Sequence, residues 1–168
     1  IYEHVKFDNF KFFTIAQINK LKERTLTMNG VSKSYAMTGW RIGYAAGPKN
    51  IIAAIRKIQS QSTSNPSSIS QAAAVEALNG TQSFIKKRAK SFSDRRNFVV
   101  NYLNNIPGIT CLMPKGAFYV FPSCKGLIGK KTKIKNDTDF VQKLLEKQNV
   151  AVVQGSAFGL DGYFRISY

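Results

Sequence analysis

The sequence has few of the residues that build disulfide frameworks and metal centres. Its 168 residues include two cysteines, Cys111 and Cys124, and one histidine, His4. Two thiols without a repeated spacing do not form a disulfide scaffold, and a single histidine does not complete a zinc ligand set. We therefore expect no structural metal and a reducing, cytoplasmic location.

Long apolar runs and acidic side chains are also scarce. No apolar stretch approaches the ~20 residues that a membrane span needs, so we expect no membrane association through a spanning helix. Nine acidic residues stand against 25 basic ones, which gives a formal net charge of +16. Such an excess is compatible with nucleic-acid binding. However, the basic residues are spread along the chain and do not gather in one patch with aromatic residues, so we expect no nucleic-acid partner.

Hydrophobic residues make up 43% of the chain, which is typical of a folded globular protein. Segments with helical periodicity alternate with short strand-like runs, and this alternation predicts an α/β fold. The predicted strands are 1–7, 26–28, 40–46, 109–113, 117–121, 150–154 and 163–168, and the predicted helices are 49–61, 70–79, 81–104 and a helix that is capped by Asp137 or Thr138 and ends near 148.

Both ends of the sequence lie inside strand-like runs. The first run opens directly at Ile1, and the last is still in progress at Tyr168. We therefore expect the sequence to be a fragment of a longer protein at both ends.

One lysine lies among small and polar residues in a glycine-containing turn. The stretch from Asn29 to Gly43 reads NGVSKSYAMTGWRIG, with Lys33 as its only lysine and Arg41 eight residues later. A deprotonated lysine amine attacks carbonyl carbons, and an aldehyde cofactor offers one. A guanidinium group grips phosphate through two parallel hydrogen bonds. The pair therefore indicates a site for a phosphorylated aldehyde.

This stretch resembles the pyridoxal-phosphate attachment signature of the class-I aminotransferases. The matching positions are Gly30, Val31, Ser32, Lys33, Ala36, Met37, Gly39, Arg41, Ile42 and Gly43. The stretch is most similar to the bacterial aspartate aminotransferase branch, some members of which also accept prephenate. Residues 1–3, 114–119 and 162–168 resemble other family segments in the family's order, so the resemblance covers essentially the whole chain.

The resemblance implies the α/β fold of the fold-type I pyridoxal-phosphate-dependent transferases. Residues 1–90 would be the end of the large cofactor-binding domain with its linking helices. Residues 91–168 would be the small C-terminal α/β domain, truncated. The implied activity is transfer of an amino group between aspartate and 2-oxoglutarate, in a homodimer with active sites at the subunit interface.

The same resemblance implies a role for each matching side chain. Lys33 would hold pyridoxal 5'-phosphate as a Schiff base and, once released, would move a proton between substrate and cofactor. Tyr2 would donate to the phenolic oxygen of the cofactor, and Arg41 would bind its phosphate with help from Ser32. Arg165 would bind the substrate α-carboxylate in a bidentate pair.

Several family features are absent from the sequence. The aspartate that pairs with the pyridine nitrogen, the ring-stacking aromatic residue and the glycine-rich phosphate loop would precede Ile1. Gly30 stands where related branches place a phosphate-binding serine. We therefore expect the isolated chain to have little or no transaminase activity.

Three alternatives remain open at the level of sequence. The chain could belong to an aminotransferase for alanine or for aromatic amino acids. It could be the cofactor-sensing module of a transcription regulator, which a DNA-binding segment in the full-length protein would favour. It could also be a basic binding fragment with no cofactor, which salt-sensitive DNA binding would support.

Overall fold

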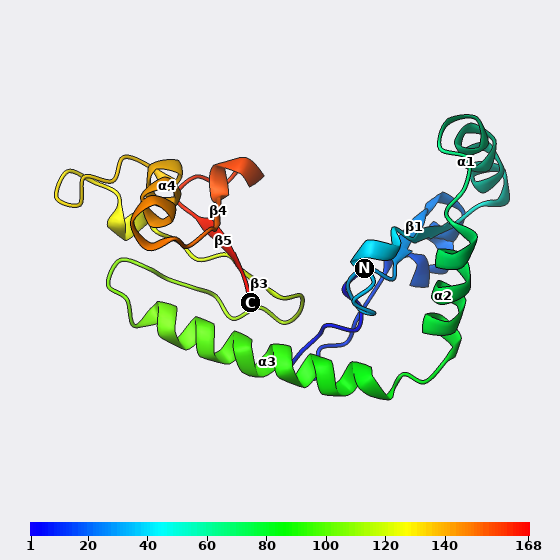
Figure 1. The fold of residues 1–168 in the computed structure, drawn as a ribbon, viewed down its shortest axis with the longest axis horizontal. Helices are drawn as coiled ribbons and strands as arrows, with labels where there is room; N and C mark the ends of the chain where they lie inside the picture. Colours follow the sequence, from blue (N-terminus) through cyan, green and yellow to red (C-terminus); the bar gives the residue numbers. More distant parts are fainter. The chain divides into compact units, whose positions relative to one another are not determined.

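The computed structural model describes residues 1–168, and Figure 1 shows the order of the elements. The chain divides into two compact units, residues 1–88 and 89–168, with the division inside helix α3 (Ser83–Asn104). The mixture of helices and strands confirms the predicted α/β class. None of the helices combines the length and the apolar character that crossing a membrane requires.

The first unit contains a two-stranded antiparallel sheet. Strands β1 (Thr27–Gly30) and β2 (Gly43–Ala46) pair so that Gly30 lies opposite Gly43. The second strand was predicted to begin at residue 40, but a 3₁₀ turn, Thr38–Trp40, precedes it. Two further 3₁₀ segments, Ile15–Gln17 and Asn19–Arg24, lie before β1.

Two helices complete this unit. Helix α1 (Lys49–Ser62) starts directly after Pro48, as predicted, because the fixed φ of proline suits a helix start. Helix α2 (Ser68–Asn79) contributes Ala74 to a small core. Helix α1 buries none of its residues, and its Ile58 side chain is 71% exposed.

The predicted strand over residues 1–7 is wrong. The backbone N–H of Val5 donates to the Tyr2 carbonyl at 2.8 Å, which closes a turn, and only Lys6 forms an isolated bridge. Val5 and Phe7 are both buried. The alternation of apolar and polar residues therefore reflects one buried side of an irregular segment. Alternation with a period of two residues does not by itself distinguish such a segment from a paired strand.

The second unit is built on a three-stranded antiparallel sheet with β5 in the centre. The strands are β3 (Tyr119–Val120), β4 (Val153–Gln154) and β5 (Phe164–Ser167), in the order β3-β5-β4. The predicted strand 109–113 is reduced to one bridge, between Thr110 and Ser123. Two core clusters meet at Leu103 and Ile166, and Cys124 is fully buried in one of them.

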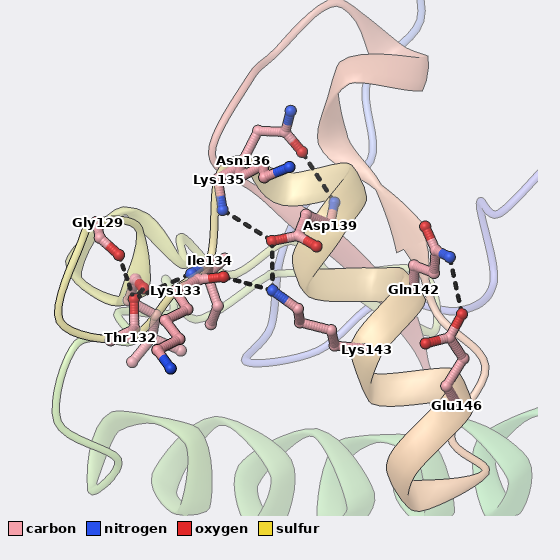
Figure 2. A network of polar contacts seen from close by, with 11 residues as sticks. Gly129, Thr132, Lys133, Ile134, Lys135, Asn136, Asp139, Gln142, Lys143 and Glu146 are labelled. Carbon is pink, nitrogen blue, oxygen red and sulfur yellow. Dashed lines mark hydrogen bonds and ion pairs between the residues drawn. The ribbon is translucent and has the colours of Figure 1, made fainter.

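Helix α4 (Asp137–Gln148) packs beside β4. Its cap is Asn136, whereas Asp137 or Thr138, one and two residues later, was predicted; the Asn136 Oδ1 accepts from the Asp139 N–H at 2.8 Å. The Asp139 carboxylate accepts in turn from the Lys135 N–H and from Lys143 Nζ, each at 2.8 Å. Figure 2 shows this network, which joins the lysine-rich loop before the helix to its first turns.

Candidate active site

Lys33 lies in the connection between the paired strands β1 and β2, which runs from Val31 to Ile42. Two hydrogen bonds shape the turn around it, from the Tyr35 N–H to the Val31 carbonyl (3.3 Å) and from the Ala36 N–H to the Lys33 carbonyl (3.2 Å). Because the strands are paired at Gly30 and Gly43, both ends of the connection are held side by side.

Gly30 makes this close pairing possible. A Cβ atom on Gly30 would lie only 3.0 Å from the carbonyl oxygen of Ile42, closer than nine in ten real Cβ contacts. A glycine at this position therefore lets the two ends of the Lys33 connection approach each other. This is a structural reason for the glycine that stands three residues before the lysine.

Buried side chains fix the backbone on both sides of Lys33. Val31 has no exposed surface and packs with Ile42 and Ala74. Ser34 is buried, its hydroxyl donates to the Ile1 carbonyl at 3.3 Å, and its own carbonyl accepts from Arg88 Nη1 at 3.2 Å. Lys33 itself is half-buried and lies in the chain between the buried Val31 and Ser34.

The first residues of the chain lie against this turn. Asn29 Nδ2 donates to Glu3 Oε1 at 2.5 Å, and the contact of Ile1 with Ser34 holds the other side of the segment. Tyr2, half-buried, lies between these two anchors in the chain. Burial raises the pKa of Tyr35, and the negative charge of Glu3 raises it further. The segment therefore places an acidic group among the aromatic residues near Lys33.

Arg41, one residue before the end of the connection, has a left-handed backbone conformation, with φ 55° and ψ 45°. Its side chain is exposed, and Nη1 donates to the Thr38 carbonyl at 2.9 Å. A guanidinium carries five N–H donors, so this one bond leaves most of them for a phosphate. Ser32 is half-buried in the turn next to Lys33.

Arg165 belongs to the second unit and lies on the central strand β5. Its Nε is buried and has no hydrogen-bond partner, and it is the one side-chain nitrogen or oxygen of the 168 residues in that condition. The guanidinium carbon lies 4.7 Å from the ring centroid of Tyr119 and 4.9 Å from that of Phe158. The group is thus held by aromatic faces while its polar edge lacks a carboxylate from this chain.

A buried carboxylate supports the turn that carries Phe158. Asp137, 2% exposed, accepts from the Ser156 N–H at 2.7 Å, at the 3₁₀ turn Gly155–Phe158. Burial raises the pKa of Asp137, but hydrogen bonds from the backbone and hydroxyl of Ser156 and from the N–H groups of Asp137 and Gly162 outweigh it. The pKa therefore lies below its ordinary value, and Asp137 holds the turn as a carboxylate.

Four of the five expected site residues lie in the first unit: Ser32, Lys33 and Arg41 on the β1–β2 connection, and Tyr2 in the N-terminal segment that contacts it. The chemistry of this set, an amine, a guanidinium, a hydroxyl and a phenol, fits a phosphorylated aldehyde. Sequence reasoning missed the side chains that surround Arg165. Asp137 was expected only as a helix cap, and nothing in the local pattern marked Tyr119 or Phe158.

A family model described as aminotransferase class I and II matches residues 1–168. The chain belongs to this family. The enzymes of the family depend on pyridoxal phosphate, the cofactor that the resemblance implied.

Close relatives in the family are bacterial. The chain is 60% identical to the aspartate aminotransferase of Rhizobium meliloti (strain 1021), over all of its own length and 42% of that protein. It is also 60% identical to a probable aspartate/prephenate aminotransferase of Rhizobium leguminosarum bv. phaseoli, of which it covers 43%. The crystal structure of the Rhizobium meliloti aspartate aminotransferase superposes with a TM-score of 0.95 at 60% identity, over the whole chain and 43% of the crystallised chain. The chain therefore spans less than half the length of these relatives.

Proposed function

We propose that this chain is part of a pyridoxal-phosphate-dependent aminotransferase that moves an amino group between aspartate and 2-oxoglutarate. The observation that carries the proposal is the Lys33 turn, which presents a lysine and an arginine on one short connection pinned by paired glycines. The names of the relatives favour aspartate as the amino donor and prephenate as a further acceptor. In this reading, residues 1–90 complete a large domain, residues 91–168 belong to a small one, and the full-length protein is a cytoplasmic homodimer.

Each side chain has a distinct part in this proposal. Lys33 Nζ holds the cofactor at its aldehyde carbon, Arg41 and Ser32 hold its phosphate, and Tyr2 donates to its phenolic oxygen. The cofactor supplies an electron-withdrawing ring that stabilises negative charge at the substrate α-carbon. Once the substrate amine has displaced it from the cofactor, the free Lys33 Nζ would take the proton from that carbon and deliver it to the cofactor's former aldehyde carbon, which is general base and acid work. Arg165 orients the substrate through its α-carboxylate.

The test is reduction with borohydride in the presence of pyridoxal phosphate, followed by peptide mapping of the full-length protein. We expect one reduced adduct, on Lys33, that disappears in Lys33→Arg and persists in the exposed-lysine control Lys57→Arg. Labelling of many lysines to equal extent, or none at all, would contradict the proposal. Conversion of aspartate to its 2-oxo acid by the unreduced full-length protein with pyridoxal phosphate separates an aminotransferase from a cofactor-binding regulator, and comparison with alanine and aromatic amino acids tests the substrate.

A further inference from the structure

Arg165 is stabilised in an unusual way for a partly buried arginine. Such a group normally pairs with a carboxylate, because removing a charge from water is unfavourable without compensation. No carboxylate of this chain forms an ion pair with Arg165, and its buried Nε lacks any acceptor. The compensation comes from the rings of Tyr119 and Phe158, since the guanidinium carbon lies over both at 4.7 and 4.9 Å.

Ring faces stabilise a cation without occupying its N–H donors. A protein carboxylate would take those donors and would have to be displaced by any incoming anion. Aromatic faces instead leave the donor edge of the guanidinium open for a planar, two-oxygen ligand. The contacts of Arg165 therefore hold its position and leave its binding capacity unused.

Strand register explains why Tyr119 meets Arg165. Successive residues of β5 point to opposite faces, so Phe164 and Ile166 enter the core while Arg165 faces the other way. Tyr119 pairs with Ser167, two residues after Arg165, and thus lies diagonally across from the arginine on the same face.

Phe158 reaches the arginine from a separate turn that is itself braced. Its ring meets Phe121 edge to face at 5.8 Å, and Phe121 stacks on Tyr163 at 5.6 Å. The turn is tied to the buried Asp137 through the Ser156 N–H. Phe158 nevertheless remains 51% exposed.

We propose that Tyr119 and Phe158 form an aromatic clamp, two positioning residues that fix the Arg165 guanidinium so that its N–H edge receives a substrate α-carboxylate. The clamp rests on the proposed function of Arg165 and deepens it. It acts only through the arginine and takes no part in the chemistry at Lys33.

The test compares Tyr119→Leu and Phe158→Leu with the conservative Tyr119→Phe and Phe158→Tyr in the full-length protein. We expect each leucine variant to raise the KM for aspartate about tenfold with kcat nearly unchanged, since loss of a cation–ring contact weakens binding. The conservative variants keep a ring face and should retain the original KM. The reaction of the cofactor with ethylamine, which has no carboxylate, should be the same in all of them.

A double-substitution cycle shows whether the rings act through the arginine. In an Arg165→Ala background, neither leucine substitution should raise the KM further. Additive effects there would overturn the clamp, as would leucine variants with an unchanged KM. If Arg165→Ala itself leaves the KM unchanged, the substrate role of Arg165 falls and the clamp with it. Labelling of Lys33 by borohydride in every variant confirms an intact cofactor site and separates these results from failure of the proposed function.

Discussion

Arg41 and Arg165 are both available to anions, but their surroundings make them available in different ways. Arg41 is exposed and bonded only to the Thr38 carbonyl, so little of its environment needs to change when a ligand arrives. Arg165 is partly buried and held by two rings, with one donor left without a partner. An exposed arginine suits a phosphate that stays bound, and a clamped arginine suits a carboxylate that must be oriented at each turnover.

Replacement of Arg41 tests its role toward the cofactor. In the full-length protein, Arg41→Gln should weaken pyridoxal-phosphate binding about 10- to 100-fold, because hydrogen bonds to a charged group contribute about 1.5–3 kcal/mol. The pyridoxal-phosphate affinity of Arg41→Lys should lie between those of the original protein and Arg41→Gln, since an ammonium group keeps the charge but cannot form the two parallel hydrogen bonds of a guanidinium. The affinity is measured by cofactor titration of the apoprotein, with Arg56→Gln on α1 as the exposed control. Equal affinity in Arg41→Gln and the control would rule out a phosphate role.

Among the elements, the 3₁₀ turn Gly155–Phe158 depends on a single buried carboxylate. The lowered pKa of Asp137 means that the folded state binds its proton less readily than the unfolded chain does. The stabilisation is therefore complete above the unfolded pKa of about 3.9 and is lost as the pH falls through the folded value.

Asp137→Asn should remove this stabilisation, about 1–3 kcal/mol near pH 7, because a neutral amide accepts the Ser156 N–H more weakly. Urea unfolding of the full-length protein between pH 7 and pH 2.5 measures the effect. The difference in the free energy of unfolding between the original protein and the variant should become smaller as the pH is lowered. A difference that is constant with pH would show that packing, and not the charge, is lost.

The start of helix α4 offers a second test at the element scale. Asn136→Ala removes the side-chain acceptor for the Asp139 N–H and should lower the free energy of unfolding by about 1 kcal/mol. Asn136→Ser keeps an acceptor and should lose much less. Thermal unfolding of the original protein and the two variants gives the order of their stabilities. Equal stabilities would show that the other hydrogen bonds in Figure 2 hold the start of the helix without the Asn136 side chain.

Helix positions were largely predictable from sequence, and five of the seven predicted strands overlap an observed strand, whereas strand bounds and the runs 1–7 and 109–113 were not predicted correctly. Helix α1 starts after Pro48 because proline and isoleucine spacing are local signals. Strand pairing depends on distant partners, so residues 109–113 keep only the bridge at Thr110. The Lys33 turn was found because its signature is contiguous. The clamp was missed because Tyr119, Phe158 and Arg165 come from three segments that only the fold brings together.

For the molecule as a whole, the exposed apolar surface of the first unit has consequences for the chain in isolation. Ile58 on α1 and Ile69 and Val75 on α2 are 71%, 72% and 59% exposed. Exposed apolar side chains of this kind promote association. The formal charge of +16 opposes it through repulsion, which salt screens.

We expect the isolated 168-residue chain to self-associate, more strongly at high salt, and to lack transaminase activity. Sedimentation velocity at low and high ionic strength measures the association. Ile58→Gln together with Ile69→Gln should reduce it, and Lys57→Gln, on the same helix as Ile58, should not. A chain that stays monomeric at every salt concentration would show that these helix faces do not associate.

At position 41, with its left-handed backbone, we expect glycine to favour stability and arginine to favour the proposed activity. Glycine adopts φ 55° without the roughly 1–2 kcal/mol penalty of a residue with a Cβ atom. A mutant library selected only for heat tolerance should therefore enrich Arg41→Gly, because the one hydrogen bond lost is exposed. A library selected for growth that requires the proposed aminotransferase activity should keep arginine. The frequencies of glycine and arginine at position 41 would then show whether a set of sequences was selected for stability or for activity.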